Sequence, residues 1–331
     1  MSAGQLSPKR SNSALALVGD FGGTNVRLAL ADISSPTPVI ANVRHYHSKE
    51  FAQAADTIEA YVRDTAHKPT VAVIAAAGPV KAGTVRFTNL GWSLSESDLK
   101  SLSFTSAAIV NDFVAAAFAT RLLGESDLHR IGPAATGGSG NVAVIGPGTG
   151  FGASALIIDS GVRPVAVAAE GGHASFAPDD PVEIDVLRIL MSRFGHVSIE
   201  RLLSGSGLCS LHAALNSIEG VSDPVDDAEV ITARALADNP LSLRTVDRFC
   251  AILGGTAGNI ALTYGALGGV YIAGGIAPGI LPILDRSPFR ARFEAKGRFA
   301  DYLRAIPTSV ITRPDAAFLG AAYVARTLPA A

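Results

Sequence analysis

The chain has little cysteine and little charge, and it has no long apolar run. Its 331 residues include only two cysteines, Cys209 and Cys250, which form no CxxC pair and no zinc-type spacing with histidine. We therefore expect two thiols in a reducing compartment, not a disulfide framework or a zinc site. No stretch of about 18 uninterrupted apolar residues occurs, which argues against a transmembrane helix.

Neither positive nor negative charge is in large excess. Lys and Arg number 27 against 29 Asp and Glu, giving a net charge of −2, and no basic stretch suggests a nucleic-acid or anionic-membrane partner. With 48% hydrophobic and 17% charged residues, the composition is that of a soluble globular protein. Residues 1–13 are polar, and the apolar run at 14–18 is too short for a signal peptide. We expect a cytoplasmic protein with a disordered N-terminal extension over residues 1–13.

A rhythm of strand, glycine-rich turn and strand occurs twice in the chain. Each copy continues with a third strand, a helical stretch and a buried strand that ends in Gly and Pro. The predicted strands are 14–20, 25–32, 38–48 and 70–77 in the first copy, with 141–150, 152–161, 163–172 and 268–278 in the second; the helical stretches are 50–66 and 241–266. Two such copies predict an α/β, duplicated actin-like (ribonuclease H-like) two-domain fold with a central cleft. An accidental likeness between two glycine-rich hairpins is the alternative.

The length also favours two domains. We expect a small α/β domain formed by residues 14–122 plus 312–331, and a large α+β domain over 123–311.

Residues typical of helix ends predict two further helices. Asp180 and Pro181 open a helix that Gly195 closes, which is the usual order of cap residues. A second helix is predicted from the Asn111-Asp112 pair to Gly124.

Two glycine-rich turns suit phosphate. Glycines let backbone N–H groups approach an anion closely, and Asp20 at the end of a strand is positioned to hold Mg²⁺ through water. The second turn loosely matches a GxGxxA dinucleotide pattern, but a strand rather than a helix follows it, and no GxxxxGK[ST] P-loop occurs. Ordinary hairpin turns are the alternative. The candidate phosphate residues are Gly22, Gly23, Thr24, Asn25, Gly148, Thr149 and Gly150, and Gly274 and Gly275 are candidates for adenine or ribose.

Polar residues at element ends suit a sugar. Asp112 follows a predicted strand, as a carboxylate that accepts a hydroxyl proton would, although Asn111-Asp112 also reads as a helix cap. Glu170 and His173, separated by two glycines, can face one small ligand; a structural histidine is the alternative. Glu200 taken alone reads as a solvated helix residue. The other histidines share no spacing, and we give them no role.

Eight ordered motifs then resemble the bacterial glucokinase family over residues 15–326. They are DFGGTN, NDFVAAAFA, GPGTGFG, EGGHASFAP, HVSIERLLSGSGL, GNIAL, GGVYIAGGI and FEAKGRF. The resemblance implies the actin/hexokinase ATPase fold and ATP-dependent phosphorylation of glucose at its 6-hydroxyl, with ATP and Mg²⁺ as cofactors. It also implies a homodimer formed through the larger domain.

The resemblance further implies residue roles. Asp112 resembles the catalytic base of the family. The residues that resemble its glucose ligands are Asn111, Asp112, Glu170, His173 and Glu200, with Asn89 and Trp92 near the sugar. The related repressor-and-kinase sugar family carries a cysteine-rich zinc motif after its Gly-His element, which this chain lacks. A kinase for another hexose and a non-catalytic sugar-sensing regulator are the alternatives that share this fold.

Overall fold

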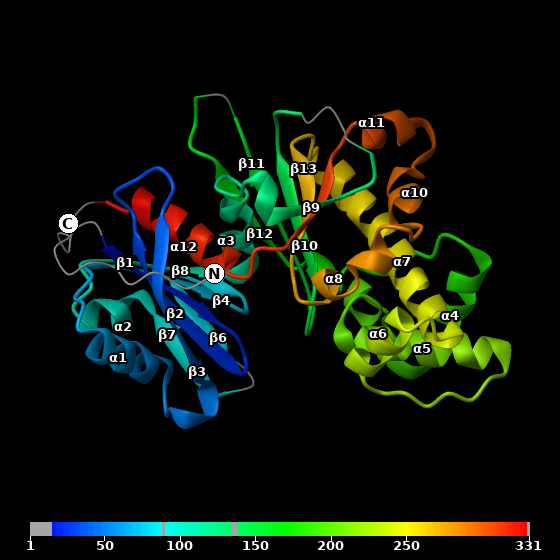
Figure 1. Ribbon diagram of the computed structural model, residues 1–331, viewed down its shortest axis with the longest axis horizontal. Coiled ribbons are helices and arrows are strands. Elements are labelled where there is room, and N and C mark those ends of the chain that lie inside the picture. Colours follow the sequence, from blue (N-terminus) through cyan, green and yellow to red (C-terminus); the bar gives the residue numbers. More distant parts are fainter. Residues whose placement is uncertain (1–14, 88–89, 134–137, 160, 330–331) are drawn as a thin grey trace. The chain divides into compact units, whose positions relative to one another are not determined.

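A computed structural model describes residues 15–87, 90–133, 138–159 and 161–329 (Figure 1). Its contacts divide the chain into two compact units. The first unit ends at Gly124 and resumes at Arg313, and the second runs from Glu125 to Thr312. The predicted N-terminal extension over 1–13 and residue Asn89 lie outside the described residues.

The first unit is built on a five-stranded sheet in the order β3-β2-β1-β4-β8, with a smaller sheet, β5-β6-β7, beside it. The strands β1, β4 and β8 are parallel, whereas β1, β2 and β3 form an antiparallel meander. The strands are β1 (Leu15–Phe21), β2 (Asn25–Asp32), β3 (Val39–His47), β4 (Val71–Ala76), β5 (Val80–Lys81), β6 (Thr84–Phe87), β7 (Trp92–Ser95) and β8 (Ser106–Asn111).

Both faces of this sheet are buried, which explains the continuous apolar run in β1. Successive side chains of a strand point to opposite faces. Leu17 and Phe21 accordingly pack in one core with Tyr61 of α1, while Ala16 and Val18 pack in another with α12. The helices of this unit are α1 (Ala54–Thr65), α2 (Glu96–Ser101), α3 (Asp112–Ala119) and α12 (Ala316–Thr327), with the short turn η2 (Ser48–Glu50). Figure 1 shows α12 lying beside α3.

The second unit repeats this sheet order. Its six strands run β12-β11-β10-β13-β14-β9, so an antiparallel meander is again followed by two parallel strands, and β9 adds an edge. The duplicated α/β fold that the sequence predicts is therefore confirmed. The strands are β9 (Leu128–Ile131), β10 (Val142–Pro147), β11 (Phe151–Ile157), β12 (Val165–Ala169), β13 (Gly269–Ile272) and β14 (Thr308–Ile311).

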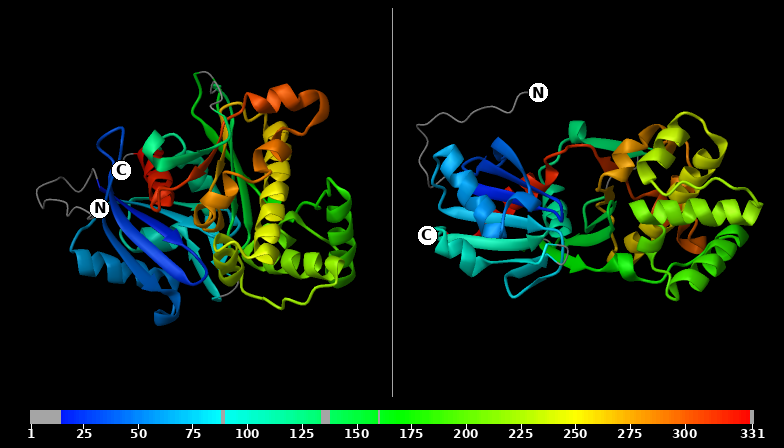
Figure 2. Two further views of the ribbon diagram at one scale, coloured as in Figure 1. Left: turned by 45° about the vertical axis from the view of Figure 1, so that its right-hand side comes forward. Right: turned by 90° about the horizontal axis from the view of Figure 1, so that it is seen from below.

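Helices α7 and α8 contact this second sheet, and residues of the sheet and of the helices of this unit form one core. Figure 2 shows the ribbon from two further directions. The helices of this unit have the following bounds. They are α4 (Pro181–Phe194), α5 (Gly205–Glu219), α6 (Ala228–Leu236), α7 (Pro240–Tyr264), α8 (Ile276–Gly279), α9 (Leu281–Leu284), α10 (Phe289–Glu294) and α11 (Ala300–Arg304). Short 3₁₀ turns are η3 (Glu125–Asp127), η4 (Gly171–His173), η5 (Ile199–Arg201) and η6 (Gly297–Phe299). Among the described residues, no helix combines the length and apolarity needed to cross a membrane.

The ends of two helices can be compared with the ends predicted from cap residues. Helix α4 begins at Pro181 behind the Asp180 cap and ends before Gly195, as predicted. The prediction that the helix after Asn111 continues to Gly124 was wrong, because α3 ends at Ala119. There the N–H groups of the next residues bond three positions back, Arg121 to Phe118 and Leu122 to Ala119, which tightens the chain into turns.

Helix α7 contacts α10 through glycines. A Cβ built on Gly254 would lie 2.0 Å from the carbonyl oxygen of Phe289, and one on Gly258 would lie 2.6 Å from that of Phe293. The next residue, Gly255, has only Arg292 Nη2 near its Cβ position, at 3.9 Å. The two helix backbones therefore touch along the face that carries Gly254 and Gly258.

We predict that Gly254→Ala destabilises the protein by about 1–3 kcal/mol, because the methyl group forces the backbones of α7 and α10 apart. The matched variant Gly255→Ala should change stability by less than about 1 kcal/mol, in the stabilising direction, since alanine favours a helix interior. Urea unfolding followed by circular dichroism measures both. Equal losses for the two variants would contradict the contact.

Candidate functional site

The carboxyl ends of β1, β4 and β8 lie side by side at one edge of the first sheet. Phe21 pairs with Ala76, which in turn pairs with Asn111. The predicted phosphate turn, residues 22–25, follows β1, and Asp112 follows β8. Two strand spacings, roughly 10 Å, therefore separate the turn from Asp112 along this edge.

The turn after β1 is held by backbone and side-chain bonds. The Gly22 N–H donates to the Asn25 carbonyl at 3.0 Å, and the Ser48 N–H donates to the Thr24 carbonyl at 3.0 Å. The Asn25 side-chain oxygen lies 3.0 Å from Nδ1 of His47, a histidine to which the sequence analysis gives no role. The end of β3 thus braces the turn, and the Asn25 oxygen is already engaged.

Asp20, the predicted Mg²⁺ residue, is held by an arginine. Arg27 donates from Nε to Asp20 Oδ2 at 3.0 Å and also contacts that oxygen through Nη2. Its Nη1 donates to the Pro314 carbonyl at 2.9 Å, and its guanidinium lies over the Phe318 ring at 5.4 Å. Sequence reasoning missed Arg27. The signal lay in the hairpin, where Asp20 and Arg27 stand directly opposite each other.

Asn111 is the N-cap of α3, as the capping alternative expects. Its side-chain oxygen accepts the N–H groups of Phe113 and Val114 at 2.9 and 3.3 Å, and its amide donates to the Gly78 carbonyl at 3.2 Å. Asp112 begins the helix, is half-buried, and accepts the Phe113 N–H at 3.1 Å. The cap therefore fixes the backbone on which the Asp112 carboxylate stands.

In the second unit, the predicted site residues also follow strands that end at one edge of the sheet. Strands β10, β12 and β13 point the same way, so their carboxyl ends meet. The turn at 148–150 follows β10, Glu170 follows β12, and Gly274 comes two residues after β13. Gly274 has φ +82°, and a Cβ there would lie 2.4 Å from the Pro147 carbonyl oxygen. Gly274 therefore approaches the end of β10 more closely than a side chain would allow, whereas nothing lies within 4 Å of a Cβ built on Gly275.

The three predicted sugar residues of this unit come together through η4 and η5. The Ile199 N–H donates to the Ala174 carbonyl at 2.9 Å, which joins the two turns. Glu170 and His173 side chains are 63% and 64% exposed, with 4.0 Å between His173 Nε2 and Glu170 Oε2. Glu200 is half-buried. It is therefore not the freely solvated residue that its local sequence suggests.

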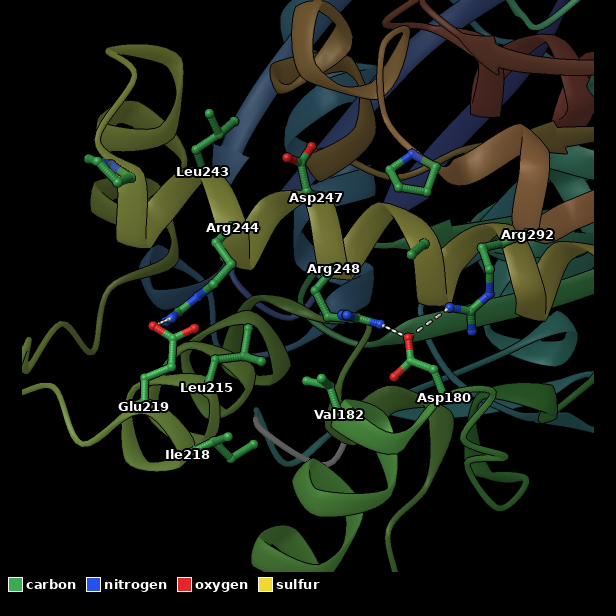
Figure 3. A pocket seen from close by; sticks show the side chains of 13 residues that line it. Asp180, Val182, Leu215, Ile218, Glu219, Leu243, Arg244, Asp247, Arg248 and Arg292 are labelled. Atoms are coloured by element: carbon green, nitrogen blue, oxygen red, sulfur yellow. Dashed lines mark hydrogen bonds and ion pairs between the residues drawn. The ribbon is translucent and has the colours of Figure 1, made fainter.

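A cavity of about 670 Å³ lies elsewhere in the second unit, between α4, α5, α7 and α10 (Figure 3). Its 13 lining residues include none of the predicted site residues. Arg244 pairs with Glu219, Arg248 pairs with Asp180, and Arg292 lies 3.7 Å from Asp180. The arginines that face the cavity are already paired, so we assign it no anionic ligand.

The ion pairs beside this cavity join helices. Fully buried Glu183 of α4 accepts from Arg248 of α7 at 3.1 Å and from Arg292 of α10 at 2.8 Å. Burial by itself raises the pKa of Asp180, but the Glu183 N–H and the two guanidiniums outweigh it, and the pKa lies below its usual value. Burial lowers the pKa of Arg292, but Glu183 more than offsets this and the pKa is raised. These groups stay charged and hold the helices together.

We predict that Asn111→Ala lowers the free energy of unfolding of the ligand-free protein by about 1 kcal/mol, because α3 loses its cap. Asn111→Ser keeps a capping oxygen and should remain close to the wild type. Urea unfolding without sugar or nucleotide separates this effect from any substrate contact. A serine variant as unstable as the alanine variant would show that capping is not the source.

Known proteins resemble this chain over nearly its whole length. Residues 17–328 match the family model described as Glucokinase. The glucokinase of Caulobacter sp. (strain K31) is 49% identical over 310 residues, which cover 93% of this chain and 94% of that protein. The crystal structure of a glucokinase from an Antarctic psychrotroph is 34% identical, with a TM-score of 0.87 over 95% of this chain and 99% of its own. A ROK family glucokinase from Streptomyces griseus, solved with glucose and AMPPNP, shares the fold at 20% identity, with a TM-score of 0.64 over 95% of this chain and 99% of its own. From these matches we conclude that the chain belongs to the glucokinase family.

Proposed function

We propose that this protein transfers the γ-phosphoryl group of ATP to the 6-hydroxyl of D-glucose, giving glucose 6-phosphate and ADP, the first step of glycolysis. The observation that carries this proposal is membership of the glucokinase family over residues 17–328. The first unit supports it chemically, because a carboxylate and a glycine turn share one sheet edge there. The chain is thus an ATP:hexose phosphotransferase, with glucose and ATP as its small-molecule partners.

Asp112 is the proposed general base. The glucose 6-hydroxyl oxygen attacks the γ-phosphorus, its proton passes to the Asp112 carboxylate, and the bond from the γ-phosphorus to the β–γ bridging oxygen breaks as ADP leaves. A carboxylate at the first residue of a helix lies beside the N-terminal N–H groups, whose partial positive charge stabilises a negative charge there. The Asn111 cap supports this role, since it fixes the start of α3.

The N–H groups of Gly22 and Gly148 donate within their own turns, so the remaining backbone N–H groups of the turns at 22–25 and 148–150 are the proposed phosphate donors. Gly274 and Gly275 are proposed to lie toward adenine or ribose. Mg²⁺ fits the residues present. Among the described residues no cluster of three His, Cys, Asp or Glu side chains offers a complete protein cage, and Mg²⁺ commonly takes one carboxylate together with phosphate and water. Arg27 engages Asp20 Oδ2, so we assign Oδ1 to the hydrated ion. When bound, Mg²⁺ supplies positive charge that neutralises the β- and γ-phosphates.

The proposed glucose ligands are Asn111, Asp112, Glu170, His173 and Glu200. Such groups give selectivity, because bound glucose covers them, and an analogue that lacks a hydroxyl leaves one covered polar group without a partner at a cost of about 1–3 kcal/mol. A single pocket change shifts hexose preference by a similar amount, so a kinase for another hexose is the nearest alternative. A non-catalytic sugar sensor is the other. A panel of hexoses in a coupled ADP-release assay separates all three.

The remaining proposals concern the whole molecule. We assign the two domains to residues 14–122 plus 312–331 and to 123–311, and we expect the protein in the cytoplasm. The resemblance to the family alone supports a homodimer, and light scattering at micromolar concentration tests it.

We predict that Asp112→Ala lowers kcat by about 10²–10⁴-fold, because no other group accepts the hydroxyl proton. Asp112→Asn, which keeps the shape of the side chain but is not basic, should fall equally far. Both variants should bind AMPPNP in calorimetry as the wild type does. Turnover near the wild-type rate in either variant would remove Asp112 from this role.

We predict that Glu170→Gln raises KM for glucose about 5–100-fold, because an amide loses the charge-assisted bond to a hydroxyl. KM for ATP should stay unchanged. Asp185→Asn is the control, since Asp185 lies on α4 in an ion pair with Arg188 and outside the proposed site. Steady-state kinetics with varied glucose measure the effect. An unchanged KM for glucose would count against Glu170 as a ligand.

A further inference from the structure

Glu200 lies against the glycine turn that follows β10. Its Oε2 accepts the backbone N–H of Phe151 at 2.8 Å, across 49 positions of sequence. A Cβ built on Gly150 would lie 2.5 Å from the same oxygen. Glycine at position 150 therefore leaves the space that the Glu200 carboxylate occupies.

The segment that carries Glu200 holds the turn at a second point. The Gly205 N–H donates to the Gly148 carbonyl at 2.9 Å, and within the turn the Gly148 N–H donates to the Gly150 carbonyl at 2.8 Å. The Ser204 hydroxyl donates to the Glu200 carbonyl at 2.8 Å and accepts the Gly207 N–H at 3.0 Å as the cap of α5. The conformation of the turn thus depends on residues 200–205.

The carbonyl group of Phe151 meets the segment of Glu170 and His173. A Cβ on Gly172 would lie 2.2 Å from the Phe151 carbonyl oxygen, so η4 packs directly on that carbonyl. The Phe151 backbone therefore has its N–H on one proposed sugar ligand and its carbonyl against the turn that carries two others.

We infer that Glu200 is a positioning residue for the phosphate turn at 148–150 as well as a sugar ligand, and that its carboxylate couples sugar binding to nucleotide binding. The inference rests on the proposed function, which makes Glu200 a glucose ligand and the turn a phosphate site. A hydroxyl bonded to Glu200 restricts the carboxylate to the position in which it holds the Phe151 N–H. The turn is then pre-organised for phosphate, and linkage makes the effect reciprocal.

Calorimetry with glucose alone and with AMPPNP alone tests the coupling. Glu200→Ala removes the acceptor for Phe151 and should weaken AMPPNP binding about tenfold in the absence of sugar, whereas Glu200→Gln keeps an acceptor oxygen and should bind AMPPNP like the wild type. Both variants should weaken glucose binding. Rescue of nucleotide binding by glutamine distinguishes positioning of the turn from loss of the sugar contact.

Two glycine variants form a matched pair. Gly150→Ala pushes the flexible Glu200 carboxylate away from the Phe151 N–H and should weaken the binding of glucose and of AMPPNP about fivefold each. Gly279→Ala adds the same methyl group on α8, outside the proposed site, where nothing lies within 4 Å, and should leave both affinities unchanged. In the Glu200→Ala background, Gly150→Ala should have no further effect on AMPPNP binding, because the carboxylate is gone.

The outcomes separate the inference from the proposed function. Wild-type affinity of Glu200→Ala for AMPPNP, or equal losses of glucose binding in the two glycine variants, would overturn the coupling. Additive effects of Gly150→Ala and Glu200→Ala on the affinity for AMPPNP would overturn the coupling as well. If the wild type binds AMPPNP but neither binds nor phosphorylates glucose, the proposed function fails, while the comparison of Glu200→Ala with Glu200→Gln still tests the link to the turn.

Discussion

Parallel pairing of strands is the constraint on which the rest of the molecule depends. Because β1, β4 and β8 run the same way, Phe21, Ala76 and Asn111 align, and whatever follows each strand emerges at one edge. The second unit repeats this arrangement with β10, β13 and β14, which are parallel neighbours too. Ligands of open α/β sheets bind outside the carboxyl ends of such strands. A one-residue slip in register would turn every side chain to the other face and move these groups with it.

A position at the edge of the sheet does not by itself orient a side chain. Short polar contacts with neighbouring residues do so. Arg27 holds Asp20 from the neighbouring strand, and the Asn111 amide ties the start of α3 to the Gly78 carbonyl. Each contact joins a residue proposed for chemistry to one that touches no substrate in the proposal. A mutation at Arg27 would therefore act on activity through geometry, whereas one at Asn111 would also remove a proposed glucose contact. The effects should combine with those of mutations at Asp20 or Asp112 non-additively.

Much of the fold could be predicted from the sequence. Strand β2 lies at 25–32 as predicted, since its polar and apolar residues partly alternate, and Asp180, Pro181 and Gly195 mark the ends of α4. The end of α3 was not readable, because Leu122 and Leu123 keep helical spacing while the chain has already turned. The bond from Phe151 to Glu200 spans 49 positions and leaves no periodic signal. Contacts between distant segments depend on packing that no local pattern encodes.

The glycines of the second turn show that a sequence motif does not reveal why each of its positions is glycine. Glycine at 148 borders open space, and a side chain there would meet no atom of the protein within 4 Å; glycine at 150 is required by the Glu200 carboxylate. Read as a phosphate loop, the two are equivalent. In the folded chain, the Cβ position of the first borders open space, and that of the second is filled by a side chain of the protein itself. The same residue type therefore borders open space at one position and allows internal packing two residues later, and only the neighbours of each Cβ position distinguish the two.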